Sequence, residues 1–310
     1  MKHTLKIALL LLFIFFITQV VGLAITKEYI SVKQYVDPET NIITKEIIIE
    51  DLPYNVERPE IEGPYAILFI LLAILIGTTL LLILIKFKKL KLWKLWFFFA
   101  IFFAMAITFS AFIPQSIAAL LAFMLAILKI YKPTTLTQNL TEVFIYGGLA
   151  AIIVPLFEFS NPQFNVLGVF SLLLLISIYD IIAVNRTKHM VTLAKFQTKS
   201  KVFAGLMIPY KKQQTQATSL KKTKEKGAKL AVLGGGDIGF PLIFAGVVMK
   251  DLMLSNTEII GYLKTLIIPF FVTMALAFLL FKGKQDKFYP AMPYLTVGCV
   301  VGYLVVLLLF

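Results

Sequence analysis

Residues 65–85 read YAILFILLAILIGTTLLLILI and contain no charged side chain. About 20 apolar residues are needed to cross a bilayer, because a helix rises about 1.5 Å per residue through about 30 Å of hydrocarbon. The apolar run is continuous, whereas the strands of an outer-membrane barrel alternate between apolar and polar residues. Residues 65–85 therefore predict a membrane-spanning α-helix.

Apolar windows of this kind recur along the whole chain, which is 59% hydrophobic and only 15% charged. This composition is far from that of a soluble globular domain. We predict an all-α polytopic membrane protein in which residues 1–310 form one membrane-embedded domain. Its nine transmembrane helices are expected at 5–25, 65–85, 95–113, 115–128, 143–157, 164–184, 230–249, 258–281 and 290–310.

The distribution of charge predicts the orientation of these helices. The 27–64 segment has four Lys or Arg against nine Asp or Glu, whereas KFKKLKLWK (86–94) has five lysines. KIYK (129–132), FKGKQDK (281–287) and the connection 185–230 are also basic. Because basic loops stay on the cytoplasmic side, we predict a cytoplasmic N-terminus and an extracellular C-terminus, in the cell (plasma) membrane.

The segments between the helices give weaker signals. The extracellular 27–64 segment alternates weakly (TNIITKEIIIE), which favours a short hairpin. Within the cytoplasmic loop 185–230, residues 211–229 are rich in Lys, Gln and Thr and are predicted to be disordered. HMVTLAKFQTKSKVF (189–203) is typical of a helix on the membrane surface. The net charge of +13 lies in such loops, so we expect the lipid bilayer and not nucleic acid as a partner.

The N-terminal residues allow two interpretations. MKHTLK followed by an apolar run resembles a signal peptide. We expect residues 5–25 to be retained as the first helix, with cleavage as the alternative. His189 has no Cys or acidic partner at ligand spacing, and Cys299 lies within an apolar run. We therefore expect no metal site, no disulfide and no cofactor.

Two acidic side chains, Asp180 and Asp237, lie well inside apolar windows. Asp180 is about four residues from the inner end of the 164–184 helix, and Asp237 is about seven residues from the inner end of the 230–249 helix. These positions correspond to depths of about 6 and 10 Å from the same membrane face. The remaining acidic residues near the membrane are expected in loops or at helix ends, among them Glu142, Glu158, Asp251 and Glu258.

An ionisable group inside a membrane is costly and is a candidate functional residue. Two carboxylates that meet at low dielectric tend to share a proton. One can then take a proton from water while the other hydrogen-bonds a peptide carbonyl, as in aspartic proteases. Three alternatives remain: a pathway for protons or cations, a buried polar pair that fastens two helices together, and a non-catalytic membrane scaffold that binds single-pass helices.

Three short motifs accompany these aspartates, in order: Tyr179-Asp180, Gly234-Gly235-Gly236-Asp237 and Pro290-Ala291-Met292-Pro293. Together they resemble the YD, GxGD and PAL motifs of the presenilin and signal peptide peptidase family of intramembrane aspartyl proteases. The match looks closest to the archaeal presenilin homologues, and Met292 stands where the family has leucine. Each motif alone is weak, but all three in order and at matching depth are specific.

The resemblance implies that Asp180 and Asp237 are the catalytic pair and that the 164–184 and 230–249 helices carry them. It implies that the PAL segment, at the start of the 290–310 helix, holds the substrate in an extended form. The expected substrates are transmembrane-helix peptides of membrane proteins, or signal peptides. Eukaryotic presenilins need partner subunits and signal peptide peptidases do not; we expect no obligatory subunit here.

The motif residues also have structural interpretations. The glycines before Asp237 give close backbone access to an unwound substrate, or close packing of helices. Pro290 and Pro293 break regular pairing, and proline is also favoured in the first turn of a helix. Tyr179 offers a hydroxyl group beside Asp180, or packs at the membrane interface.

Overall fold

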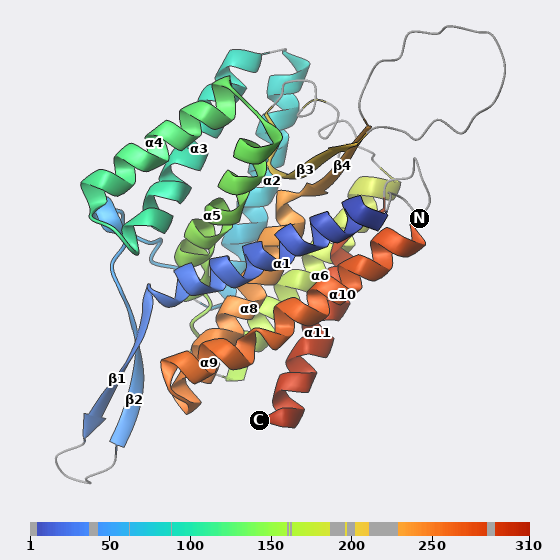
Figure 1. Ribbon diagram of the computed structural model, residues 1–310. Helices are drawn as coiled ribbons and strands as arrows, with labels where there is room; N and C mark the ends of the chain where they lie inside the picture. Colours follow the sequence, from blue (N-terminus) through green and yellow to red (C-terminus); the bar gives the residue numbers. More distant parts are fainter. Residues whose placement is uncertain are drawn as a thin grey trace, which may run out of the picture.

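The computed structural model describes residues 5–36, 43–61, 63–87, 89–159, 161, 163–186, 196, 202–210, 229–283 and 289–310. Helices dominate the fold, and two short antiparallel hairpins accompany them (Figure 1). The helices are α1 (Leu5–Lys27), α2 (Pro64–Lys86), α3 (Leu90–Ser110), α4 (Gln115–Tyr131), α5 (Thr135–Ile153), α6 (Gln163–Asn185), α8 (Gly235–Ser255), α9 (Glu258–Thr265), α10 (Ile267–Lys282) and α11 (Met292–Leu309). The strands are β1 (Ile30–Val36), β2 (Ile43–Ile49), β3 (Gly205–Tyr210) and β4 (Lys229–Gly234).

The helices confirm the predicted polytopic membrane fold. Within the described part of the chain, eight helical segments are long and apolar enough to cross a membrane, and α9 with α10 forms one of them. Helix α4 has 17 residues, the lower limit of the length that crosses a bilayer. The predicted orientation of the two termini stays a prediction.

Helix α5 begins earlier than the apolar window 143–157 predicted. It starts at Thr135, after Thr134, whose hydroxyl accepts the N–H of Thr137 at 3.1 Å in a capping box. The first two turns, TLTQNLTE, are polar, so a hydropathy window misses them although they are helical. Glu142 therefore lies inside the helix, two turns from its start, and not at its end.

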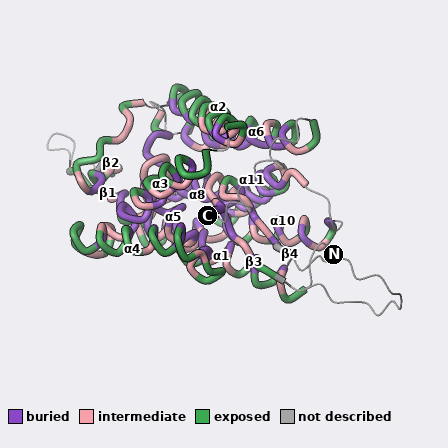
Figure 2. Tube along the Cα trace, turned by 90° about the horizontal axis from the view of Figure 1, so that it is seen from above, coloured by how far each residue is buried: buried purple, intermediate pink, exposed green. Residues whose placement is uncertain are grey.

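Helix α8 is the centre of the bundle. It packs against α1, α5, α6, α10 and α11, and residues 241–250 are all buried. Figure 2 shows the buried residues gathered around α8 and the exposed residues on the outer helices. The outward side chains of α2 and α4 are large and apolar, as expected for a surface that faces lipid.

Helices α10 and α11 approach each other closely at two glycines. A Cβ atom added at Gly298 would lie 2.8 Å from Val272 Cα, and one added at Gly302 would lie 2.8 Å from Ile268 Cα. Small residues one turn apart allow such close backbone packing in membranes. This packing fixes the position of the first turn of α11, which contributes to the site described below.

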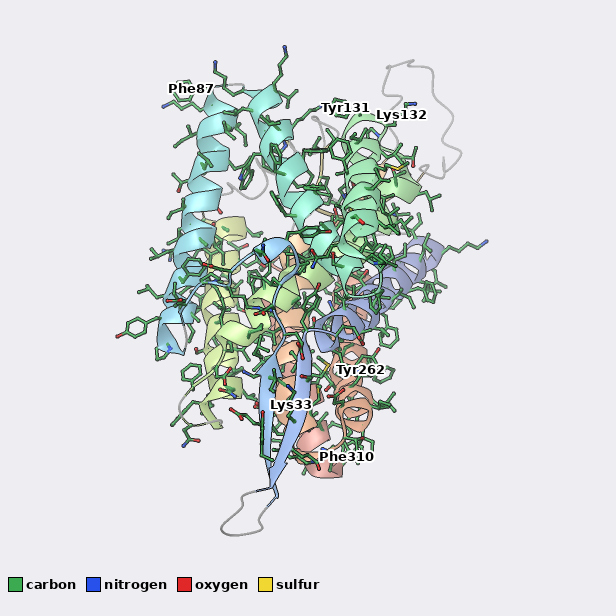
Figure 3. All side chains as sticks on the ribbon, turned by 90° about the vertical axis from the view of Figure 1, so that its left-hand side faces the viewer. Lys33, Phe87, Tyr131, Lys132, Tyr262 and Phe310 are labelled. Carbon is green, nitrogen blue, oxygen red and sulfur yellow. The ribbon has the colours of Figure 1, made fainter. Side chains whose placement is uncertain are left out.

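The β1–β2 hairpin confirms the hairpin predicted from the alternation in 27–64. Tyr29, just before β1, donates its hydroxyl to the carbonyl oxygen of Ile107 at 2.5 Å, and burial raises the pKa of Tyr29 to about 12. The N–H of Val32 donates to Glu258 Oε1 at 3.0 Å. Figure 3 places Lys33 of this hairpin and Phe310 at one end of the bundle, and Phe87 and Lys132 at the other.

Two predictions for the long connection lie largely outside the described residues. The predicted disordered segment 211–229 is described only at Lys229, which begins β4. The predicted surface helix 189–203 is described only at Phe196, Val202 and Phe203.

Candidate active site

The GGGD stretch lies where a strand becomes a helix. Strand β4 pairs antiparallel with β3, from Gly205 opposite Gly234 to Tyr210 opposite Lys229. Helix α8 begins at Gly235, whose N–H donates to the carbonyl oxygen of Ala204 at 3.1 Å. The prediction of one helix over 230–249 is therefore wrong for its first five residues. A short apolar run does not distinguish a strand from a helix, and the pairing strand β3 lies in a separate segment.

The backbone conformation of Gly205, at the start of β3, requires glycine. Its φ is +134°, a conformation that side-chain-bearing residues rarely adopt. A Cβ atom at this position would lie 2.1 Å from the carbonyl oxygen of Leu233 in the paired strand. The sequence does not single out Gly205, because a positive φ is not readable from one sequence.

Asp237 lies in the first turn of α8, three residues after the N-cap residue Gly234. Its carboxylate turns back toward that cap: a Cβ atom at Gly234 would lie 3.3 Å from Asp237 Oδ2. The absence of a side chain at Gly234 thus leaves room for the carboxylate. The first turn of a helix also offers unpaired N–H groups and the positive end of the helix dipole.

Asp180 lies on α6 and contacts the start of α11. Its Oδ2 accepts the N–H of Met292 at 3.2 Å, and Met292 is the first residue of α11. About one turn away from this contact, the hydroxyl groups of Ser177 on α6 and Thr296 on α11 form a hydrogen bond of 2.8 Å. The PAMP segment therefore contacts the YD aspartate through its backbone.

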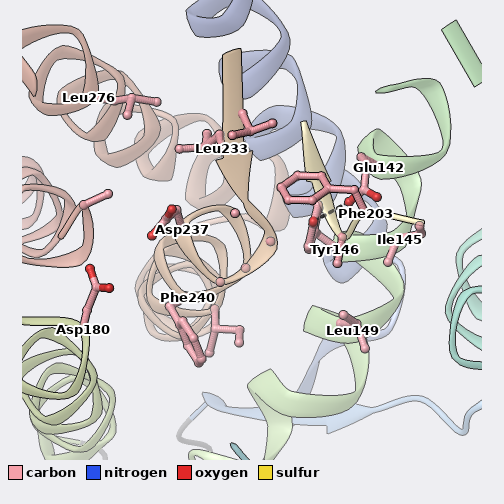
Figure 4. Close-up of a pocket in the computed structure, with 18 of the residues that line it drawn as sticks. Glu142, Ile145, Tyr146, Leu149, Asp180, Phe203, Leu233, Asp237, Phe240 and Leu276 are labelled. Atoms are coloured by element: carbon pink, nitrogen blue, oxygen red, sulfur yellow. Dashed lines mark hydrogen bonds between the residues drawn. The ribbon is translucent and has the colours of Figure 1, made fainter. Parts of the chain in front are cut away.

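Both aspartates line one cavity of about 560 Å³. Asp180 is 4% exposed and Asp237 is 8% exposed, so both carboxyl groups are withdrawn from the outer surface. Figure 4 shows the two side chains turned into this cavity from the neighbouring helices α6 and α8. The rest of the lining is mainly apolar and includes Phe97, Ile145, Leu149, Phe240, Leu276 and Leu280.

The other predicted site residues divide into two groups. Gly234, Gly235, Gly236 and Ala291 line the cavity with the aspartates. Tyr179 instead faces α2, where its hydroxyl lies 3.5 Å from Thr78 Oγ1. Pro290 and Pro293 flank the start of α11, with Pro293 in its first turn, where proline needs no intrahelical N–H bond.

A buried polar cluster that no sequence motif indicates lies beside the cavity. Glu142 on α5 is 1% exposed and accepts hydrogen bonds from Lys129 Nζ at 2.5 Å and Gln138 Nε2 at 3.1 Å. Tyr146 donates its hydroxyl to the other oxygen of the same carboxylate. Both Glu142 and Tyr146 line the cavity.

Two interpretations from the sequence are wrong here. Glu142 was expected in a loop or at a helix end, and Lys129 was assigned to the basic loop 129–132. Lys129 is instead 2% exposed and lies in α4, paired with Glu142. The usable signal was the spacing of Gln138, Glu142 and Tyr146, four residues apart and therefore on one helix face.

The structure thus describes a polytopic helical membrane protein whose two central acidic side chains face one cavity. Residues 41–310 match the family described as signal-peptide peptidase, presenilin aspartyl protease. The chain belongs to this family, and it is an intramembrane aspartyl protease and a multi-pass integral membrane protein.

Solved structures agree with this assignment at the level of the fold. One, of a presenilin family intramembrane aspartate protease in space group C222, is 18% identical, covers 98% of this chain and 99% of its own, and superposes with a TM-score of 0.59. Another, of such a protease in space group P2, is 20% identical, covers 97% of each chain and gives a TM-score of 0.55. A comparison with proteins of curated function returns no match.

Proposed function

We propose that Asp180 and Asp237 act as a general acid/base pair that activates water to hydrolyse a peptide bond in or near a transmembrane helix or signal peptide. The observation that carries this proposal is the shared cavity, into which α6 and α8 each bring one buried carboxyl group. The family defines the chemistry as aspartyl proteolysis. Among the described residues lining the cavity, the acidic ones are these two and Glu142.

The reaction needs one proton between the two aspartates. The ionised carboxylate takes a proton from water, while the protonated partner donates a hydrogen bond to the scissile carbonyl oxygen. Water attacks the carbonyl carbon while the protonated partner passes its proton to the carbonyl oxygen, which forms a tetrahedral gem-diol. The carbon–nitrogen bond then breaks as the nitrogen receives the proton that came from water, and one gem-diol hydroxyl returns its proton to the other carboxylate. The pair therefore ends with one proton, as it began.

The backbone around each aspartate favours this chemistry. The N–H of Met292 donates to Asp180, and Asp237 lies in the first turn of α8, at the positive end of the helix dipole. Such helix N-termini stabilise negative charge without bringing a cation into the membrane. Either carboxylate can therefore hold the charge in an otherwise apolar cavity, and we assign no fixed order of acid and base.

We propose that β4 binds the unwound substrate as an added strand. The side-chain oxygen of Asn139 accepts the N–H of Met207 at 2.9 Å, and the side-chain nitrogen of Asn139 donates to the carbonyl oxygen of Met207 at 3.0 Å. Both backbone groups of Met207 therefore point away from β4. In an antiparallel ladder, residues opposite each other direct their backbone groups either both inward or both outward. Val232 is opposite Met207 and lines the cavity, so its N–H and C=O face outward on the side of the aspartates.

Replacing Val232 with proline tests this edge. Proline removes the outward N–H but no bond of the β3–β4 ladder, and proline is tolerated on such edges. We expect Val232→Pro to lower kcat/KM for a transmembrane reporter peptide about tenfold and to leave the melting temperature unchanged. A tenfold decrease corresponds to the loss of about one hydrogen bond to the substrate in a dry site. Ala231→Pro is the contrasting variant, because Ala231 is the next residue along and its N–H faces β3; it should lower the melting temperature as well. Unchanged cleavage by Val232→Pro would contradict binding at this edge.

The proposed function as a whole is tested with purified protein and a single reporter transmembrane peptide. We expect cleavage within or next to the apolar segment of the peptide, without added metal, cofactor or partner protein. No cleavage in lipid or detergent that preserves the fold would contradict the proposal. A proton or cation pathway, the alternative use of two membrane aspartates, is not favoured by the family.

We also propose the arrangement of the chain in the membrane. Residues 27–64 would lie outside the cell and the 185–230 connection in the cytoplasm, with the protein in the plasma membrane and residues 5–25 retained. The packing of α1 against α5, α8 and α10 supports a retained first helix. Its Gln19 donates to the carbonyl oxygen of Ile238, the residue after Asp237, at 2.8 Å.

A further inference from the structure

The buried cluster around Glu142 lies outside the three sequence motifs and touches the strand-to-helix junction from the side of α5. We propose that Tyr146, oriented by Glu142, is a positioning residue that fixes the first turn of α8 and thereby the carboxylate of Asp237. This inference rests on the proposed function of Asp237. It assigns a role in the reaction to α4 and α5, which carry none of the motif residues.

Tyr146 packs directly on the first turn of α8. A Cβ atom added at Gly235 would lie 2.6 Å from the Tyr146 hydroxyl oxygen, and one added at Gly239 would lie 3.6 Å from Cδ1 of the same ring. Asp237 lies between these two glycines in the sequence. Because Tyr146 is 5% exposed and its ring lies against both glycines, the ring sets how closely α8 approaches α5 at this turn.

Glu142 holds the Tyr146 hydroxyl in place. One oxygen of the carboxylate accepts a hydrogen bond from the Tyr146 hydroxyl, and the other accepts hydrogen bonds from Lys129 Nζ and Gln138 Nε2. Lys129 is further held by Thr141 Oγ1 at 2.8 Å. Separating Lys129 from Glu142 would leave an uncompensated charge in a medium of low dielectric. Because the other hydrogen-bonding atoms of the pair are also occupied, the arrangement of the cluster is well defined.

The same carboxylate is coupled to the strand side of the junction. The side-chain amide of Gln138, which donates to Glu142, also lies 2.8 Å from the carbonyl oxygen of Phe203 and 2.9 Å from that of Gly205. Glu142 therefore connects to the start of β3 through Gln138 and to the start of α8 through Tyr146. These contacts hold both halves of the junction that carries Asp237.

The contact between Tyr146 and the start of α8 also explains why residue 235, the second glycine of the GGGD stretch, is a glycine. An alanine at 235 would place its Cβ 2.6 Å from the Tyr146 oxygen but 3.4 Å from the nearest ring carbons, Cε1 and Cζ. The second distance is an ordinary van der Waals contact, so the clash involves the hydroxyl group alone. Glycine at 235 and tyrosine at 146 are thus a matched pair, and removal of the hydroxyl should make room for alanine.

The test compares Tyr146→Phe, Gly235→Ala and the double variant in two measurements: reporter cleavage, and hydrogen–deuterium exchange of the backbone in residues 229–239. We expect Tyr146→Phe to lower kcat about tenfold with KM within about twofold, because the aspartate is displaced but the substrate edge is not. Gly235→Ala should lower kcat about a hundredfold and raise exchange in 229–239. The double variant should return to the level of Tyr146→Phe in both measurements.

Tyr262→Phe is the matched control, since it also removes one tyrosine hydroxyl, which donates to the carbonyl oxygen of Val20 at 3.3 Å, away from the cavity lining. It should leave kcat and the exchange of 229–239 unchanged. Effects of Tyr146→Phe and Gly235→Ala that simply multiply in the double variant would overturn the inference, as would normal exchange in both single variants. Exchange does not depend on cleavage, so an inactive wild type would contradict the proposed function while the positioning contact is still measured. If Gly235→Ala fails to fold, an unchanged kcat and unchanged exchange in Tyr146→Phe overturn the inference by themselves.

Discussion

Asp237→Asn and Asp180→Asn are each expected to lower kcat for a transmembrane reporter peptide by about 10⁴-fold or more, the scale on which removal of one member of a catalytic unit acts. Asparagine keeps the size of the side chain and an oxygen that can accept from the N–H of Met292. It cannot take a proton from water, nor can it hold the acidic proton that the partner needs. The measurement is single-turnover cleavage followed by gel or mass spectrometry, with the melting temperature of each variant as the check on folding.

The double variant makes this prediction sharper. Two groups that work as one unit lose their effect when either is removed, so Asp180→Asn/Asp237→Asn should be no slower than either single variant. The matched control is Asp251→Asn, which changes an aspartate elsewhere on α8 whose Oδ1 accepts from Asn165 Nδ2 at 3.1 Å. It should cleave at the wild-type rate. Substantial cleavage by either single variant at the active-site positions would contradict the assignment of the pair.

Gly205→Ala is expected to have the second large effect, although Gly205 is outside the sequence motifs. Alanine must adopt φ near +134° with its Cβ 2.1 Å from the carbonyl oxygen of Leu233, so β3 and β4 must separate at the pair Gly205–Gly234. The strain is about 1–3 kcal/mol for the backbone alone. We expect a lower melting temperature and a kcat lowered by about a hundredfold, since Asp237 follows Gly234 by three residues.

Gly77→Ala is the control for this glycine substitution. Gly77 lies within α2, and an added Cβ meets no heavy atom within 4 Å. Alanine has the higher helix propensity, so the variant should melt at the same or a slightly higher temperature and cleave normally. If Gly205→Ala also cleaves normally, the β3–β4 hairpin does not position the aspartate.

Hydropathy predicted where the chain crosses the membrane, because each crossing must bury its backbone in a continuous apolar run. It failed at the two segments that shape the cavity. The polar first turns of α5 fell outside the window 143–157, since a helix buried among other helices can carry Gln138 and Glu142 on its inner face. The strand β4 was assigned to a helix, because the identity of an apolar residue does not reveal its pairing partner.

The candidate site was predictable only in part, for a related reason. Asp180 and Asp237 stand out in the sequence because an isolated carboxylate is rare in an apolar window. Lys129 and Glu142 did not stand out, because each lies near the end of its apolar window and charges there are ordinary. Their partnership exists only in three dimensions, where α4 and α5 meet. The same holds for Gly235, whose size is set by Tyr146 and not by its neighbours in the sequence.

The central claim is that water, activated between two aspartates, attacks the peptide bond directly. Single-turnover cleavage of the reporter peptide in H₂¹⁸O, with the products and the protein analysed by mass spectrometry, tests this claim most directly. The account predicts one ¹⁸O atom in the new carboxyl group of the N-terminal product and none in the peptides that contain Asp180 or Asp237. Incorporation of ¹⁸O into either aspartate during the first turnover would show a covalent acyl intermediate and would contradict the account.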